Sequence, residues 1–257
     1  MKQGRGAPPL LFVHGFGCSL EDWKAQFEFF AKTNEVVACD LRGHGATPGR
    51  AQECSIEHYG GDVAALASNL ELSNSLLVGH SMGCRVVLEA ARLLAERVAG
   101  LVLIDGSRLA SGDPDAAERA AQAAIDQAGY GAFAENLFRQ MFFDHGPRAK
   151  AVVARGVRQT ETIGAALWAR MARWDAAQMD GAFAAVRAPL MVIQTTTRNA
   201  ELKRTPLKAG ESSPWLDYVK SKVPGARIEV IAGLGHFPQL EAPQRVNQLI
   251  AGFAASV

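Results

Sequence analysis

The chain has 257 residues, of which 48% are hydrophobic and 21% are charged, and its formal net charge at pH 7 is +1. These values are typical of a globular protein and suit one large domain, or one domain with a small insertion. The nearly balanced charge argues against nucleic acids and acidic polymers as partners.

Six apolar runs predict β-strands. They cover residues 9–13, 35–39, 75–79, 101–105, 189–194 and 227–231. The runs are continuous rather than alternating, which is typical of a parallel sheet covered by helices on both faces. Helices are expected between them. Residues 55–70 begin at Ser55, a good N-cap, and residues 242–254 predict the last helix. Apolar residues recur at helical spacing in both segments and predict a buried face on each helix. They are Ile56, Tyr59, Val63, Leu66 and Leu70 in the first helix and Val246, Leu249, Ile250 and Phe253 in the last.

The first predicted strand runs into the turn His14-Gly15-Phe16-Gly17. A loop of this kind can present a backbone N–H to a carbonyl oxygen, and the amide of Phe16 is the candidate donor. We expect the His14 ring to brace the loop. Another segment, Asp40-Leu41-Arg42-Gly43-His44-Gly45, holds an Asp and a His four residues apart, and we interpret it as structural rather than catalytic.

Ser81 is the most informative residue of the chain, because it lies in a G-x-S-x-G sequence between a predicted strand and a predicted helix. That combination describes a nucleophile elbow. Gly79 and Gly83 lack a Cβ, so strand and helix can approach closely around the serine. The helix N-terminus beneath it favours developing negative charge, and the amide of Met82 is the second candidate oxyanion donor.

His236 lies at the tip of a glycine-rich turn that follows the strand at 227–231. A serine hydroxyl is a poor nucleophile until a base takes its proton, and imidazole does this near neutral pH. The sequence therefore pairs Ser81 as nucleophile with His236 as base.

Four segments, taken in this order, resemble those of the α/β-hydrolase fold: Val13-His14-Gly15, Asp40 to Gly45, Gly79 to Gly83 and Gly235-His236-Phe237-Pro238. The resemblance extends over residues 9 to about 254. It implies an α/β protein with a mostly parallel sheet of about six strands flanked by helices. Relatives usually have two antiparallel strands before the His-Gly strand. Only about eight residues precede it here, so these strands are expected to be absent or reduced to one short strand.

The acid that orients His236 departs from the family pattern. In most relatives it follows the strand equivalent to 189–194, but here Thr195-Thr196-Thr197-Arg198-Asn199 contains no carboxylate, and Arg198 falls near the usual acid position. Some relatives take the acid from the strand after the nucleophile helix. We therefore predict Asp105 as the acid, with Glu201 and Asp217 as alternatives.

Residues 108–185 are rich in alanine, arginine and aromatic residues, and they fall where the family inserts a helical cap. The resemblance thus divides the chain into a core, 1–107 and 186–257, and a cap, 108–185. A cap over the strand ends would form an apolar pocket above Ser81. The predicted pocket residues are Phe138, Phe142, Trp168, Trp174 and Phe237.

The resemblance implies a serine hydrolase that cleaves carboxylic esters with small to medium apolar groups, through an acyl-enzyme and without cofactor or metal. Lactones and enol lactones are close alternatives as substrates. The same triad also serves carbon–carbon bond hydrolases of aromatic degradation and cofactor-free haloperoxidases or perhydrolases. Outside catalysis, the fold serves as a slow or inactive ligand receptor or signalling protein. The pattern carries no information on oligomeric state.

Cys18, Cys39, Cys54 and Cys84 have no C-x-x-C spacing, so we expect neither a zinc site nor disulfides. Free thiols suit a reducing cytoplasm. No apolar run approaches the roughly 18–20 residues that cross a bilayer, and no signal-peptide pattern precedes the first strand. These features predict a cytoplasmic protein that binds no membrane.

Overall fold

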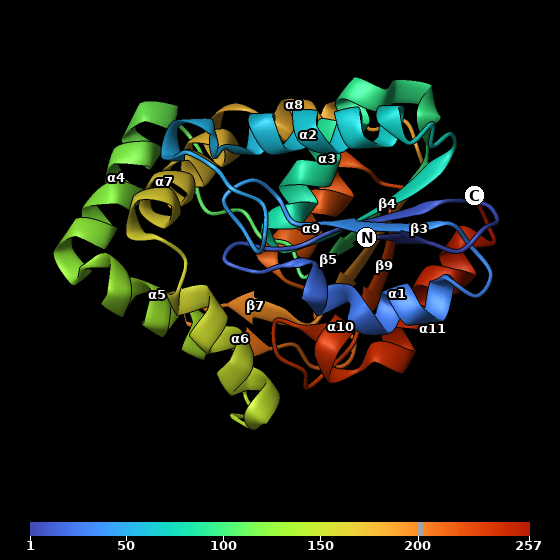
Figure 1. Ribbon diagram of the computed structural model, residues 1–257. Coiled ribbons are helices and arrows are strands. Elements are labelled where there is room, and N and C mark those ends of the chain that lie inside the picture. Colours follow the sequence, from blue (N-terminus) through green and yellow to red (C-terminus); the bar gives the residue numbers. More distant parts are fainter. Residues whose placement is uncertain (200–202) are drawn as a thin grey trace.

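The computed structural model describes residues 1–199 and 203–257. Within them, seven strands form one sheet in the order β1-β3-β2-β4-β5-β6-β9 (Figure 1). The strands are β1 (Lys2–Gln3), β2 (Leu10–Val13), β3 (Val36–Cys39), β4 (Ser75–His80), β5 (Val98–Ile104), β6 (Leu190–Gln194) and β9 (Arg227–Val230). All neighbours are parallel except β1 and β3. The predicted mostly parallel α/β sheet is confirmed.

One short strand precedes the His-Gly strand, which is one of the two predicted alternatives. This strand, β1, is the seventh strand of the sheet and runs antiparallel to β3, and the Met1 ammonium donates to the Ala38 carbonyl at 2.6 Å. Strand β5 begins three residues before the predicted position 101, because a register shift between Ser75 and Leu76 lets Val98 extend the pairing with β4.

Helices cover both faces of the sheet, as the continuous apolar strands require (Figure 1). They are α1 (Lys24–Phe30), α2 (Ile56–Asn69), α3 (Met82–Leu94), α4 (Pro114–Ala128), α5 (Tyr130–Arg139), α6 (Pro147–Val157), α7 (Glu161–Ala177), α8 (Met179–Ala184), α9 (Pro214–Lys222), α10 (Pro238–Glu241) and α11 (Pro243–Ala254). Helices α2 and α3 pack on one face and α1 and α11 on the other. Ser55 caps α2 by accepting a hydrogen bond from the His58 amide. No helix of the described residues has the length and hydropathy of a membrane span.

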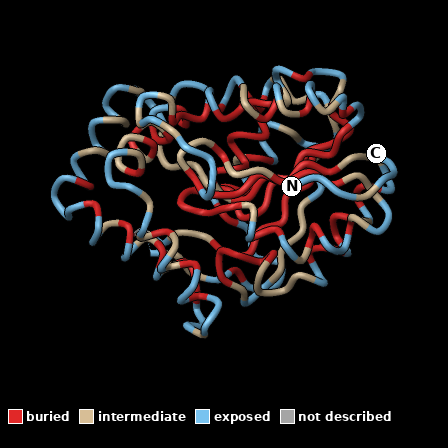
Figure 2. Tube along the Cα trace, viewed as in Figure 1, coloured by how far each residue is buried: buried red, intermediate tan, exposed pale blue. Residues whose placement is uncertain are grey.

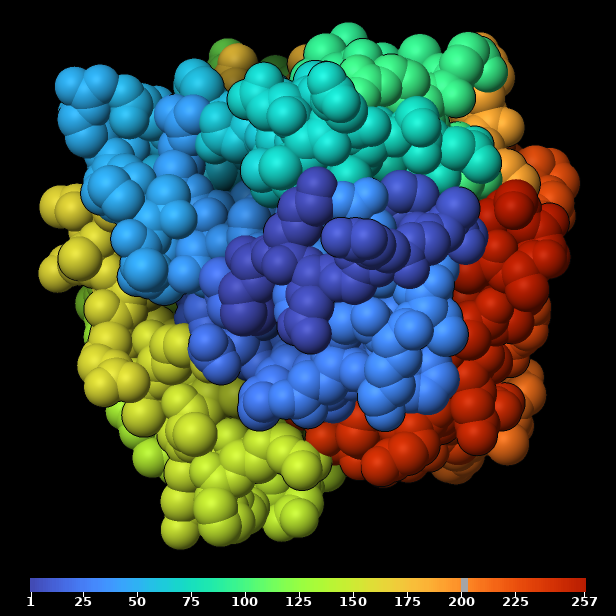
Figure 3. Space-filling model, turned by 45° about the vertical axis from the view of Figure 1, so that its right-hand side comes forward, coloured from blue at the N-terminus to red at the C-terminus, as the bar shows by residue number. Residues whose placement is uncertain are grey.

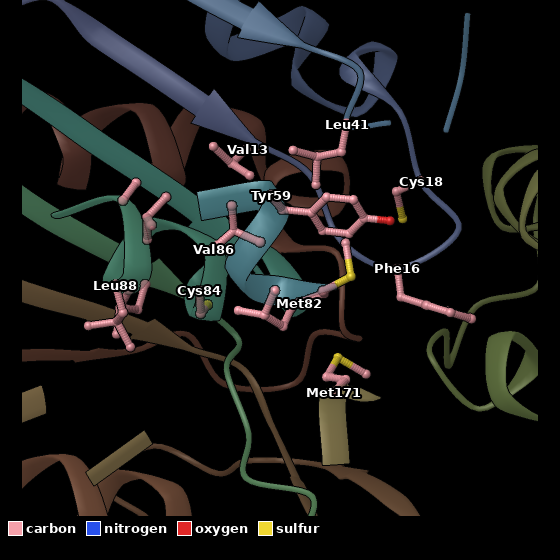
Figure 4. Packing of buried hydrophobic residues seen from close by; sticks show 14 of the residues in the cluster. Val13, Phe16, Cys18, Leu41, Tyr59, Met82, Cys84, Val86, Leu88 and Met171 are labelled. Carbon is pink, nitrogen blue, oxygen red and sulfur yellow. The ribbon is translucent and has the colours of Figure 1, made fainter. Parts of the chain in front are cut away.

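The alternating pleat of the strands divides the core into two clusters, and the strands are the most continuously buried part of the chain (Figure 2). Leu11 and Val13 of β2 face α2 and α3, while Leu10 and Phe12 face α1 and α11. Figure 4 shows part of the first cluster, in which Val13 and Val86 lie near Met82, the residue after Ser81. All four apolar residues predicted to be buried in the last helix are buried in α11.

The chain between β5 and β6 forms helices α4 to α8. Helices α4 to α7 extend from one end of the sheet (Figure 1), and part of this insertion projects from the molecular surface in Figure 3. Helix α8 packs instead against α3 and α9, on a face of the sheet. A short two-stranded hairpin, β7 (Thr196–Arg198) and β8 (Arg204–Pro206), follows β6.

A buried ion pair joins the insertion to the core. Arg85 of α3 donates from Nε and Nη2 to the two carboxylate oxygens of Asp175 of α7, each at 2.6 Å, and both side chains are almost fully buried. Asp175 also accepts the Leu109 amide at 2.6 Å, and Arg85 donates to the Ser107 carbonyl at 2.7 Å. These bonds fix α7 to the segment that follows Asp105.

Asp175→Asn should therefore lower the free energy of unfolding by about 3–5 kcal/mol, because Arg85 is left charged, buried and without its counter-ion. Urea unfolding followed by circular dichroism measures the change. The matched control is Asp115→Asn, which breaks an exposed ion pair with Arg173 and should cost less than about 1 kcal/mol. Equal losses in both variants would contradict a dominant role for the buried pair.

Candidate active site

The turn after β4 has the geometry of a nucleophile elbow. Ser81 has φ +54° and ψ −112°, a strained conformation for a residue with a side chain. A Cβ on Gly79 would lie 2.3 Å from the Gly83 carbonyl oxygen, and one on Gly83 would lie 2.4 Å from the Val13 carbonyl oxygen. Only glycine at both positions lets β2, β4 and α3 meet this closely.

His80 connects the serine turn to the histidine turn. Its Nε2–H donates to the backbone carbonyl of His236 at 2.7 Å, and the two imidazole rings have centroids 4.8 Å apart. Ser81 is thus adjacent in the chain to a residue that contacts His236. No hydrogen bond between Ser81 Oγ and His236 Nε2 is formed among the described residues, and this Nε2 is buried without a partner. Such bonds often tighten only when substrate binds.

Asp105 and His236, the predicted acid and base, lie together as a buried pair. His236 Nδ1–H donates to Asp105 Oδ2 at 2.5 Å, and the two side chains are 1% or less exposed. Asp105 follows β5 with φ +44°, a second strained backbone position, and its amide donates to the Ile193 carbonyl. The pair fixes the tautomer in which His236 Nε2 is the acceptor nitrogen.

The remaining acceptor capacity of Asp105 is filled by the segment after β6. The amides of Thr195 and Thr196 donate to Oδ1, each at 2.8 Å, and Thr196 Oγ1–H donates to Oδ2 at 2.5 Å. Arg204 of β8 donates from Nη1 to the same Oδ2 at 3.2 Å. These contacts were not predicted from the sequence, because two of the donors are backbone N–H groups, whose partners cannot be inferred from side-chain types.

Of the two alternative acids, Asp217 lies away from His236 and bonds elsewhere. Asp217 is exposed in the first turn of α9 and accepts a hydrogen bond from Ser212 Oγ at 2.6 Å. Glu201 lies outside the described residues. Arg198, which falls near the usual acid position, lies in β7.

The electrostatics of the pair keep Asp105 ionised and His236 neutral. Burial alone would raise the pKa of Asp105, but its hydrogen bond to His236 and the charges of His236 and Arg204 lower that pKa to about 2. Burial, followed by the Arg204 charge, lowers the pKa of His236 well below its usual 6.5, despite the opposing effect of Asp105. A neutral imidazole at pH 7 is the form that can accept a proton.

The two candidate oxyanion donors belong to two segments that meet at the serine, the start of α3 and the loop after β2. Met82 begins α3, and neither its amide nor that of Phe16 donates to a protein group among the described residues. A Cβ on Gly15 would lie 3.2 Å from Ser81 Cβ, so the loop after β2 runs against the serine. Figure 4 shows Met82 within the buried cluster and Phe16 at its margin. Two unpaired N–H groups beside one serine can stabilise negative charge on a substrate oxygen.

Four of the five predicted pocket aromatics surround these groups. Phe138 stacks on Phe16 at 6.3 Å between ring centroids, and Trp168 meets Phe16 edge-on at 5.5 Å. Phe142 stacks on Phe237 at 4.9 Å, and Phe237 in turn lies 5.4 Å from the His236 ring. Trp174 is buried in α7 and makes no aromatic contact with these rings among the described residues. The insertion thus brings apolar rings to both the loop after β2 and the turn that holds His236.

Glu241 and Met141 both accept backbone hydrogen bonds from the turn that holds His236, residues 235–237. Neither contact was predicted from the sequence. Glu241 of α10 accepts the amides of Gly235 and Phe237 at 2.9 and 3.2 Å. The His236 amide donates to the Met141 carbonyl at 2.7 Å, which ties the turn to the insertion.

The segment that begins at Asp40 makes hydrogen bonds that hold neighbouring loops in place. Asp40 accepts the amides of Leu20 and Ala46 at 2.8 and 2.9 Å, and His14 Nε2 accepts the Leu41 amide at 3.0 Å. Burial lowers the pKa of both His14 and His44. Within the described residues, no three histidine, cysteine or acidic side chains are grouped as metal ligands.

Comparison with known proteins agrees with this architecture. A family model described as the alpha/beta hydrolase family matches residues 10–249. A thermophilic esterase from Thermogutta terrifontis superposes with a TM-score of 0.80 and 26% identity, over 100% of this chain and 92% of that chain.

Two curated relatives match over shorter segments. A bifunctional esterase/perhydrolase from Acinetobacter calcoaceticus is 41% identical over 102 residues, which are 39% of this chain and 37% of the relative. The acetyltransferase component of an acetoin cleaving system from Pseudomonas putida is 39% identical over 106 residues, or 41% of this chain and 29% of the relative. The chain thus spans only 37% and 29% of the length of these two curated relatives.

Proposed function

The chain belongs to the alpha/beta hydrolase family, and from this premise we propose that it is a serine hydrolase that cleaves carboxylic esters with small to medium apolar groups. The observation that carries the proposal is the buried Asp105–His236 pair, which leaves His236 Nε2 as an acceptor near the strained turn of Ser81. The esterase from Thermogutta terrifontis and the esterase/perhydrolase from Acinetobacter calcoaceticus support the choice of esters.

The reaction follows from these groups. Ser81 Oγ attacks the ester carbonyl while His236 Nε2 takes its proton, and Asp105 stabilises the imidazolium that forms. The amides of Phe16 and Met82 hold the oxyanion, and removal of one such donor costs roughly 3–4 kcal/mol in comparable sites. His236 then protonates the departing alcohol. Water, activated by the same imidazole, releases the acid from Ser81.

The substrate pocket is proposed to lie between Ser81 and helices α4 to α7, which we interpret as the cap. The rings of Phe138 and Trp168 reach Phe16 from the insertion, so an apolar acyl or alcohol group would pack against them.

A p-nitrophenyl ester series from acetate to decanoate tests the function. We expect turnover with an optimum at short or medium chain length, since the aromatic rings leave limited room beside Phe16. An absence of turnover across the series would contradict the esterase proposal. Carbon–carbon bond hydrolysis and a receptor role would then be the leading alternatives.

The acid limb of kcat/KM should lie below pH 6.5. Activity requires neutral His236, so it is lost as pH falls through the pKa of this residue, which burial and Arg204 lower. Initial rates on p-nitrophenyl acetate between pH 4.5 and 8 measure the limb, with circular dichroism at each pH to exclude unfolding. A midpoint above pH 7 would contradict the assigned environment of His236.

A further inference from the structure

A cavity of about 280 Å³ opens beside Asp105 and takes no part in the reaction above. Its walls come from the segment after β5, the β7–β8 hairpin and the start of α9. Its described lining residues include Arg108, Arg198 and Arg204 and no carboxylate. Ligand pockets in proteins have volumes from roughly 300 Å³ upwards, and the volume of this cavity is close to that lower limit.

Among the described residues, the cations around this cavity outnumber the carboxylates that pair with them. Arg204 pairs with Asp105 at 3.2 Å, and Asp105 also carries the hydrogen bond of His236. Arg108 and Lys222 share one partner, Asp180.

Arg198 has no carboxylate partner among the described residues. Its pKa is lowered to about 10 by burial and then by the neighbouring charges of Arg204 and Arg85. The cavity therefore has an excess of positive charge that an anion would relieve.

One wall of the cavity is aromatic. Trp215 and Tyr218 of α9 both line it, with ring centroids 5.9 Å apart and an angle of 28° between planes. A Cβ on Gly106 would lie 2.6 Å from Trp215 Cζ2, so glycine there lets the indole lie flat against the chain. Inorganic anions gain nothing from such a wall, whereas the ring of an organic anion would bury apolar surface on it.

We propose that this cavity binds a single-ring organic carboxylate, whose carboxylate pairs with Arg198 and Arg204 and whose ring packs against Trp215 and Tyr218. Guanidinium groups match a carboxylate with two parallel hydrogen bonds, which favours this class of ligand. The site is separate from the proposed ester pocket, because neither Ser81 nor His236 lines the cavity.

Isothermal titration calorimetry with benzoate tests the proposal directly. We expect one site per chain, binding of the neutral isostere benzamide at least about tenfold weaker, and a similar loss for benzoate in Arg198→Gln. The matched control is Arg119→Gln, an exposed arginine of α4, which should bind benzoate like the native chain. Unfolding temperatures of both variants show whether they fold.

Three results would overturn the proposal: equal binding of benzamide and benzoate, unchanged benzoate affinity in folded Arg198→Gln, or tighter binding of inorganic phosphate than of benzoate. Trp168→Ala distinguishes the two sites, since Trp168 contacts Phe16 and does not line this cavity. Benzoate binding lost in Trp168→Ala but kept in Arg198→Gln would place the ligand in the ester pocket instead.

Occupancy of the cavity should also affect catalysis, an expectation that rests on the proposed function. The charged or titratable groups nearest His236 are Asp105, Arg204, His80 and Glu241. An anion paired with Arg204 weakens the influence of that cation, so saturating benzoate should move the acid limb of kcat/KM to higher pH. Calorimetry needs no turnover, so failure of the ester reaction and failure of the anion site remain distinguishable.

Discussion

Replacement of Ser81 by alanine should reduce kcat for p-nitrophenyl esters roughly 10⁶-fold, to near the uncatalysed rate plus what the oxyanion donors contribute. Among the described residues, Ser81 is the only hydroxyl-bearing residue with a positive φ, +54°, and it directly precedes α3. We therefore expect no other hydroxyl to replace it as the nucleophile. Burst kinetics and steady-state rates on the same ester measure the loss.

The matched control is Ser111→Ala, an exposed serine of the segment before α4, which should retain native rates. Far-UV circular dichroism should be the same for both variants, since the Ser81 side chain caps no helix amide. Residual turnover above about 1% of native in Ser81→Ala would contradict the assignment of the nucleophile.

Asp105→Asn should lower kcat about 10⁴-fold with little change in KM. The new side-chain amide can neither fix the His236 tautomer nor stabilise the imidazolium. Its NH₂ group would also face the Thr195 and Thr196 amides and the His236 Nδ1–H, all of which are donors and cannot accept its hydrogen bonds. Steady-state kinetics across the ester series measure the effect.

Asp217→Asn and Glu201→Gln are the comparison variants, and both should keep native rates. Because Asp105→Asn also removes the partner of Arg204, its unfolding temperature must be measured beside its kinetics. A folded Asp105→Asn with near-native kcat, together with a large loss in either comparison variant, would move the acid to that residue.

Much of the architecture can be predicted from the sequence, because buried parallel strands carry uninterrupted apolar runs. The strand boundaries fall within one or two residues except at β5, whose first residues depend on a register shift that no pattern reveals. Strand β1 is two residues long and pairs mainly through backbone groups, so its side chains give no signal.

The candidate catalytic residues could be predicted from the sequence, because their roles depend on side-chain type and on their positions after strands. Ser81, His236 and Asp105 each follow a predicted strand, and parallel strands bring their carboxyl ends to one edge of the sheet. What could not be predicted depends on tertiary contacts between distant segments. The Thr196–Asp105 bond, the Glu241 contacts with the histidine turn and the burial of Trp174 away from the other rings all depend on such packing.

Covalent labelling with an organophosphate tests whether Ser81 is the nucleophile. The native chain would be incubated with p-nitrophenyl diethyl phosphate, then digested and mapped by mass spectrometry. We expect one diethylphosphoryl group per chain, on Ser81, with loss of ester hydrolysis in proportion to labelling. An active protein that remains unlabelled, or a label on another residue that tracks with inactivation, would contradict it.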